Sequence, residues 1–161
     1  MQRNVILLQL PMLVLGATVM TFGCAAAQTP SVSYTNPSTI AQPRGYSHVV
    51  EVSGPGRTIY IAGQLGYDRT GKQGADFREQ ATLVYENLKA AIESVGGKME
   101  NIVKLNAFLT DIRAQLPIYR EVRDKFVNVA APPASTTLEV PKLAREGALL
   151  EVEAIAVLPA R

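Results

Sequence analysis

Thiol and imidazole groups are nearly absent from this chain. Its 161 residues include one cysteine, Cys24, and one histidine, His48. No intrachain disulfide can form from a single cysteine. A transition-metal site would have to be built from carboxylates, without the Cys and His ligands that such ions prefer in proteins. We therefore expect neither a disulfide nor a metal site.

Common catalytic and nucleotide-binding motifs are missing as well. A Ser-His-Asp triad could use only His48, and the chain has no Gly-x-Ser-x-Gly elbow, so we interpret His48 as a strand histidine at a surface or interface. The glycine-rich stretches 54–56 and 63–66 do not match a phosphate-binding loop and are interpreted as turns. Lys and Arg number 16 against 14 Asp and Glu, with no long basic run, which argues against a nucleic-acid partner.

Residues 1–27 have the layout of a signal peptide. Arg3 precedes an apolar run, Val5 to Met20, and small residues end at Ala27, whereas the first acidic residue is Glu51. This predicts cleavage before residue 28 and a periplasmic or secreted protein. An alternative is lipidation of Cys24, the one route by which we expect contact with a membrane. A retained membrane anchor is disfavoured because the run is short and contains a proline.

The remaining sequence predicts one α+β domain. After a lead-in segment, residues 28–44, alternation over 47–53 and 58–62 predicts two strands, and the Gly-Pro-Gly turn between them suggests a hairpin. Asp76 and Glu79 have the spacing of a capping box, which predicts a helix over 77–95 that ends at the following glycines. The domain is assigned to residues 45–161.

The second half of the domain is predicted to contain three more strands and a second helix. A strand is predicted over 102–110, then a helix with Pro117 in its first turn, then strands over 136–140 and 149–157. The order is ββ-α-β-α-ββ. Two helices can cover only one face of such a sheet, so the other face needs another layer, most simply the sheet of a second subunit.

Two carboxylates stand out on the last predicted strand. Glu151 and Glu153 are two residues apart, so they share one face of the strand. On a solvated sheet this is ordinary alternation. The same face also carries apolar residues, so the acids could instead be half-buried at a subunit contact, where a carboxylate can exchange a proton with a substrate.

Five segments in register resemble the RidA/YjgF family. They run in the family's order over residues 33–158: Gly45-Tyr46-Ser47, Tyr60 to Leu65, Ile102 to Asp111, Pro133 to Val140, and Leu150 to Val157. The resemblance implies a chorismate-mutase-like α+β fold, in which a mixed β-sheet is backed by two helices on one face. It also implies a homotrimer that closes a central barrel and has clefts at its subunit interfaces.

The resemblance further implies an activity and a set of site residues. Archetypal members hydrolyse reactive enamines and imines to 2-keto acids and ammonia without a cofactor. Tyr46 matches the cleft tyrosine, Gly63 the glycine whose backbone lies beside the substrate, and Glu151 the acid that positions or activates water. The family's Pro-Ala-Arg-Ser motif uses its arginine to grip the substrate carboxylate, and here Ser135 takes that place; a shift by one residue gives Thr136, not arginine.

This departure weakens the inference of unchanged activity. Loss of a charge-assisted contact to a carboxylate lowers affinity on the order of a hundredfold, so we expect deaminase activity that is weakened or altered in substrate. Glu151 would handle water in a cleft lined by Tyr46, Ser135 and Thr136. The alternative is a non-catalytic trimer that binds a small metabolite. Three basic residues, Arg44, Lys104 and Arg123, are candidates to replace the arginine, although for each of them the interpretation as a solvated surface charge is preferred.

Overall fold

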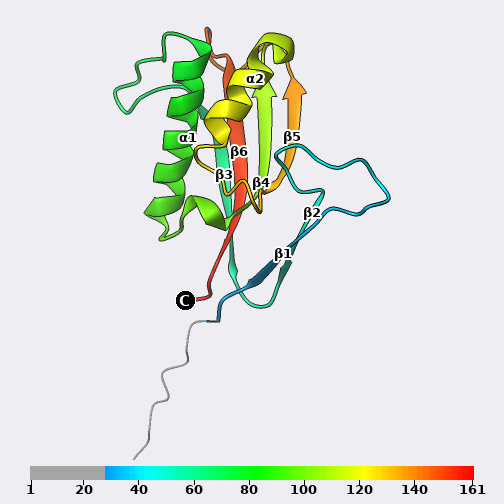
Figure 1. The fold of residues 1–161 in the computed structure, drawn as a ribbon. Helices are drawn as coiled ribbons and strands as arrows, with labels where there is room; N and C mark the ends of the chain where they lie inside the picture. The colour runs from blue at the N-terminus through cyan, green and yellow to red at the C-terminus, as the bar shows by residue number, and fades with distance from the viewer. Residues whose placement is uncertain (1–27) are drawn as a thin grey trace, which may run out of the picture.

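The computed structural model describes residues 28–161 (Figure 1). The predicted signal peptide, residues 1–27, and its Cys24 lie outside the described residues. Within the part of the chain that is described, no helix combines the length and the apolar character needed to cross a membrane.

A four-stranded mixed sheet forms the centre of the fold. Its strands lie in the order β3 (Arg57–Leu65), β6 (Leu150–Leu158), β4 (Ile102–Leu109) and β5 (Ala134–Glu139) (Figure 1). β6 is antiparallel to both of its neighbours, and β4 and β5 are parallel. The strand predicted over 102–110 is therefore central, and the α+β fold with a mixed sheet is confirmed.

Two helices cover one face of this sheet (Figure 1). The first, α1 (Phe77–Ser94), begins where Asp76 Oδ1 accepts a hydrogen bond from the Glu79 amide at 2.8 Å. Glu79 in turn accepts one from the amide of Ala75 at 2.7 Å. The chain leaves the helix at Gly96, whose φ of +82° is in the left-handed region that favours glycine. The helix predicted over 77–95 is confirmed.

The second helix, α2 (Ile112–Arg123), starts earlier than its proline suggested. Asp111 accepts a hydrogen bond from the Ala114 amide at 3.1 Å, so the helix begins at Ile112 and Pro117 lies inside it. The prediction that Pro117 occupies the first turn is therefore wrong. The Asp111 cap determines the start of the helix, and the proline is accommodated on its exposed side.

The hydrophobic core lies between the sheet and the two helices. Alternate residues of β6 and β4 point into it and are fully covered, as are the apolar residues at three- and four-residue steps on α1. The residues with no exposed surface include Leu105, Leu109, Leu150, Val152, Val84 and Leu88. The opposite face of these strands is therefore not covered by the helices.

A separate two-stranded ribbon precedes the main sheet. β1 (Ser31–Thr35) pairs antiparallel with β2 (Val49–Ser53), and the loop between them protrudes beside β5 (Figure 1). β2 and β3 do not pair with each other, so the predicted hairpin is wrong, although both strands exist. β1 lies within the segment predicted as a lead-in, and its alternation was not recognised. A short 3-10 turn, Met99–Asn101, connects α1 to β4.

Candidate functional site

The segment that carries Tyr46 is tied to the start of β5. The Ser47 amide donates to the carbonyl oxygen of Pro133 at 3.2 Å, and the Ser47 hydroxyl donates to that of Pro132 at 2.7 Å. His48, next along the chain, lies 2.8 Å from the carbonyl oxygen of Ala41 through Nε2. The tyrosine is therefore placed at the edge of β5. The half-buried histidine contacts the protruding loop from a position directly before β2, one residue outside the strand in which it was predicted.

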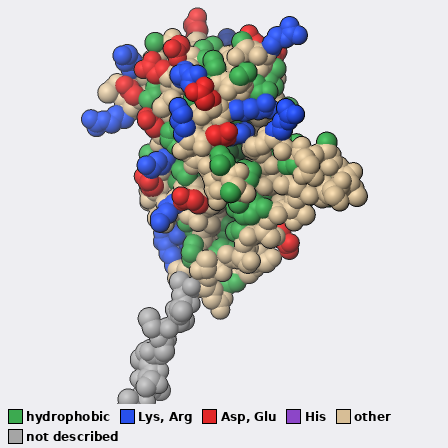
Figure 2. All heavy atoms as spheres, in the orientation of Figure 1, with side chains coloured by type: hydrophobic (Ala, Val, Ile, Leu, Met, Phe, Trp, Pro, Cys, Tyr) green, Lys and Arg blue, Asp and Glu red, His purple; other side chains and the backbone are tan. Residues whose placement is uncertain are grey.

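Beside Tyr46 lies a cavity of about 280 Å³ between β5 and α2, which we call the Tyr46 pocket. Ser135 and Thr137 are two residues apart on β5 and face the helices, because they pair with the core residues Leu105 and Ala107 of β4. The lining of the pocket comprises Arg44, Tyr46, Ile112, Leu116, Arg120, Arg123, Ser135 and Thr137. Figure 2 shows Lys and Arg side chains gathered above the protruding loop.

Arg123 is the most deeply placed charge of this pocket. The residue is 5% exposed, and its Nε and Nη2 donate to one oxygen of Asp124, Oδ1, at 2.9 and 2.7 Å. Its guanidinium carbon lies 5.8 Å from the centre of the Tyr119 ring, a distance that allows a cation–π contact. A basic group from α2 therefore reaches the cavity that contains Ser135.

Ser135 contributes a hydroxyl that residues 28–161 leave unsatisfied. Its Oγ is buried, and none of residues 28–161 forms a hydrogen bond with it. A buried hydroxyl without a partner is unfavourable by about 1–3 kcal/mol, so such groups in native proteins have a specific explanation. The residue that carries this hydroxyl is part of the lining of the Tyr46 pocket.

Glu151 and Gly63 form a second cluster. The pairing of β3 with β6 is irregular between Ile61 and Gln64, and at this point the half-buried Glu151 side chain lies against the Gly63 backbone. A Cβ atom on residue 63 would be 2.7 Å from Cδ of Glu151, closer than real contacts allow. Only glycine lets the carboxylate occupy this position.

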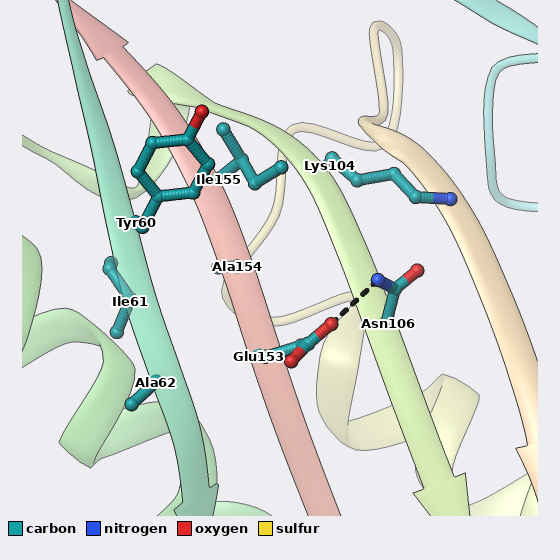
Figure 3. A pocket seen from close by; sticks show the side chains of 8 residues that line it. All are labelled: Tyr60, Ile61, Ala62, Lys104, Asn106, Glu153, Ala154 and Ile155. Atoms are coloured by element: carbon teal, nitrogen blue, oxygen red, sulfur yellow. Dashed lines mark hydrogen bonds between the residues drawn. The ribbon is translucent and has the colours of Figure 1, made fainter.

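A further cavity, of about 330 Å³, lies on the sheet face without helices. Asn106 donates to Glu153 there at 2.8 Å, and Figure 3 shows Tyr60 and Ile155 next to each other farther along the strands. Lys104 points along the same face and donates to the Thr136 hydroxyl at 2.8 Å. Lys104 and Thr136 are therefore not part of the Tyr46 pocket.

The predicted site residues thus fall into separate groups within one chain. Tyr46 and Ser135 share a pocket with Arg44 and Arg123. Gly63 and Glu151 are in contact with each other, but the register places Glu151 beside Phe108, on the face opposite to Ser135. Thr137 was missed and replaces Thr136 in the pocket; the period of two along a strand, counted from Ser135, would have found it.

Comparisons with known proteins agree on one family. Residues 37–158 match the family model described as Endoribonuclease L-PSP. A RutC family protein from Aquifex aeolicus is 37% identical over 70% of this chain and 87% of its own length. A 2-iminobutanoate/2-iminopropanoate deaminase from Dermatophagoides farinae is 35% identical over 73% of this chain and 89% of the relative.

Solved structures show the same fold. A Rid family protein of unknown function, YyfB from Yersinia pestis, superimposes with a TM-score of 0.71 and is 30% identical, with 79% of this chain and 98% of that chain covered. RidA from an Antarctic Psychrobacter gives a TM-score of 0.60 at 33% identity, over 70% of this chain and 89% of that one.

Proposed function

This chain belongs to the RidA/YjgF family, and on that premise we propose that it hydrolyses small imines or enamines to carbonyl compounds and ammonia. A relative with 35% identity carries the name of such a deaminase, and a similar name, putative reactive intermediate deaminase TdcF, belongs to an Escherichia coli relative with 33% identity. The chain's own residues support the proposal in the following way.

The position of Glu151 carries the proposal. Its side chain is half-buried, and its carboxylate lies against the Gly63 backbone, where a larger residue would displace it. A carboxylate in this position can accept a hydrogen bond from a water molecule and orient it toward an electrophilic carbon beside the glycine. These are the two residues that the resemblance assigns to the water-activating acid and the substrate-flanking backbone.

The chemistry requires one acid–base group and one water molecule. The water oxygen forms a bond to the imine carbon while Glu151 takes a proton from that water. That proton passes to the imine nitrogen, which gives a carbinolamine with a hydroxyl and an amino group on the same carbon. Glu151 then transfers the hydroxyl proton to the amino nitrogen, the carbon–nitrogen bond breaks, and ammonia leaves as the carbonyl forms. An enamine enters the same route after protonation at carbon converts it to the imine. No electrons are exchanged with an outside reagent, so the reaction needs no redox cofactor.

A complete site needs more than one subunit in this proposal. The Tyr46 pocket and the Glu151 side chain lie on opposite faces of one sheet. We propose a homotrimer in which the open sheet faces meet and Glu151 of one subunit approaches the Tyr46 pocket of the next. The open face suits a protein partner, since Tyr60 is 78% exposed and Leu138 50% exposed.

The substrate in this proposal differs from that of archetypal members. Ser135 stands where the family arginine grips a carboxylate, and export through the predicted signal peptide would separate the protein from cytoplasmic 2-aminoacrylate. We therefore propose weakened activity on the smallest 2-imino acids and a preference for other imines outside the cytoplasm.

The test is the hydrolysis of 2-iminobutanoate, generated in the assay from threonine by a dehydratase. We expect the purified protein to accelerate ammonia release, and Glu151→Gln to reduce this acceleration by about a hundredfold or more, as is typical when a general acid–base group is lost. The matched control is Glu153→Gln, which removes the same charge from the same strand face two residues away and should retain most of the activity.

A folded, trimeric protein without any acceleration on a panel of imines would overturn the proposal. If a thermal-shift screen of that protein revealed small acids that raise the melting temperature and are not consumed, the alternative function of a metabolite-binding trimer would replace it.

A further inference from the structure

We propose that the Tyr46 pocket binds the carboxylate of its ligand through Arg123, a guanidinium supplied by α2 in place of one from β5, with Arg44 and Arg120 at the same cavity. The inference rests on the proposed function because it names the group that recognises an acidic substrate at that site. It is carried by the burial of Arg123, the charge of the cavity, and the backbone that makes room for the guanidinium.

The guanidinium of Arg123 is fixed and has capacity left to bind an anion. Asp124 accepts from Nε and Nη2 through a single oxygen, and the cation lies over Tyr119. Nη1 donates to none of the residues 28–161. A buried guanidinium held in this way needs little reorganisation to accept a carboxylate, so its N–H groups are pre-positioned for one.

The charge of the cavity favours an anion. Arg44, Arg120 and Arg123 line it, whereas Asp124 is the one carboxylate bonded to any of them within residues 28–161. Arg44 and Arg120 form no ion pair in the described part of the chain. Three cations around about 280 Å³ attract a negatively charged ligand of the size of a small organic acid.

The backbone at Gly45 provides the space that Arg123 occupies. Gly45 has a φ of +75°, in the left-handed region, and a Cβ atom there would be 3.1 Å from the guanidinium carbon and closer still to Nη2. A side chain at residue 45 would push Arg123 away from its position. The glycine beside Tyr46 and the arginine on α2 therefore form one unit, independent of residue 135.

Ser135 fits this assignment as a second contact. An arginine at residue 135 would extend into the cavity that Arg123 already enters, whereas serine leaves the cavity open. Its buried Oγ has no partner in the described part of the chain, and rotation about its Cα–Cβ bond would direct the hydroxyl at an oxygen of the ligand. The ligand class is therefore a small organic acid whose carboxylate is held from the helix side.

The experiment is calorimetric titration of the purified protein with 2-oxobutanoate, a stable product of the proposed reaction, and with its uncharged amide. We expect the acid to bind and the amide to bind at least tenfold more weakly. Arg123→Gln should weaken binding of the acid by about tenfold to a hundredfold, as for loss of a charge-assisted hydrogen bond. The matched control is Arg113→Gln, the same charge change at an exposed residue of α2 outside the pocket.

A double variant that moves the guanidinium to another position tests the effect of the charge on binding separately from any effect on folding. In Arg123→Gln/Ser135→Arg the guanidinium moves to β5, and we expect it to recover at least part of the lost affinity. Should Arg123→Gln fail to fold, Gly45→Ala displaces the guanidinium without removing it, and Arg120→Gln removes an exposed charge of the pocket. Each should weaken binding of the acid more than Arg113→Gln does.

The outcomes distinguish this inference from the proposed function. Binding of the acid that depends on Arg123, in a protein without imine hydrolysis, supports the inference and overturns the function. Imine hydrolysis with a KM that Arg123→Gln leaves unchanged supports the function and overturns the inference. Equal affinity for the acid and the amide, or equal effects of Arg123→Gln and Arg113→Gln, also overturns the inference.

Discussion

The two faces of β6 differ sharply in what they carry. Leu150, Val152 and Ala156 face the helices and have no exposed surface. Glu151 and Glu153 alternate with them and face the open side, where they are half-buried and contact Gly63 and Asn106. One strand therefore contributes both to the core and to the candidate site, because successive side chains along it point to opposite faces of the sheet.

This difference separates stability from function within the sheet. On β4 and β6 the covered face is apolar, so its burial stabilises a single chain. The open face combines carboxylates, a lysine and exposed apolar residues, a mixture that gains burial only when another molecule covers it. Changes on the covered face of β4 and β6 should therefore act on folding, and changes on the open face on assembly or catalysis.

The largest effect on folding is expected from Leu105→Ala. Leu105 lies on the central strand β4, points into the core and has no exposed surface. Truncation removes apolar contacts and leaves a cavity, which lowers the free energy of unfolding by about 2–5 kcal/mol. Urea-induced unfolding of the variant and the parent, followed by circular dichroism, measures the difference.

The matched change on the open face is Leu138→Ala. Leu138 lies on β5 next to β4 and is 50% exposed. In protein dilute enough to be monomeric, its truncation should lower the free energy of unfolding by less than about 1 kcal/mol. Equal losses in the two variants would contradict the division between the faces.

The covered face is also the part that the sequence predicted best. The helix over 77–95 and the strands around 102–110 and 149–157 follow from periodic burial, which is a local property of the chain. The end of α1 at Gly96 and its start at Asp76 follow from caps, which also act within a few residues. These elements could be predicted because each carries its own signal.

Strand pairing and register were not predictable in the same way. The Gly-Pro-Gly turn reverses the chain between β2 and β3, but the partners of these strands, β1 and β6, lie elsewhere in the sequence. The choice between Thr136 and Thr137 depends on a shift of one residue in β5, which exchanges the two faces of the strand. Family resemblance named the position of the missing arginine, but only the fold shows that Arg123 enters the same pocket.

A smaller effect is expected in the core from Tyr85→Phe. The Tyr85 hydroxyl donates to that of Tyr119 at 3.0 Å, and both residues are fully buried. Its removal leaves the Tyr119 hydroxyl without this donor, which should lower the free energy of unfolding by about 1–3 kcal/mol at neutral pH. Urea-induced unfolding measures it, with Tyr34→Phe on the ribbon strand β1 as the control.

The same pair makes stability depend on alkaline pH. Burial raises the pKa of Tyr85 well above 10.0, with a further contribution from Tyr119, and burial also raises the pKa of Tyr119. Because the pKa is higher in the folded than in the unfolded protein, the stabilisation is complete below pH 10 and is lost as the pH rises beyond it. The parent should therefore lose stability above pH 10 more steeply than Tyr85→Phe; parallel profiles would contradict this origin.

The smallest effect on the folded subunit, and the clearest on its assembly, is expected from Tyr60→Asp. Tyr60 is 78% exposed on the open face, so the change should alter the free energy of unfolding of a separated subunit by no more than about 0.5 kcal/mol. If the open faces meet in a trimer, a buried carboxylate there opposes association. Sedimentation should then show a trimer for the parent and a monomer for the variant.

The unfolding midpoint of the parent should rise with protein concentration and that of the variant should not, because only association couples stability to concentration. A variant that still sediments as a trimer would show that this part of the open face lies outside the subunit contact.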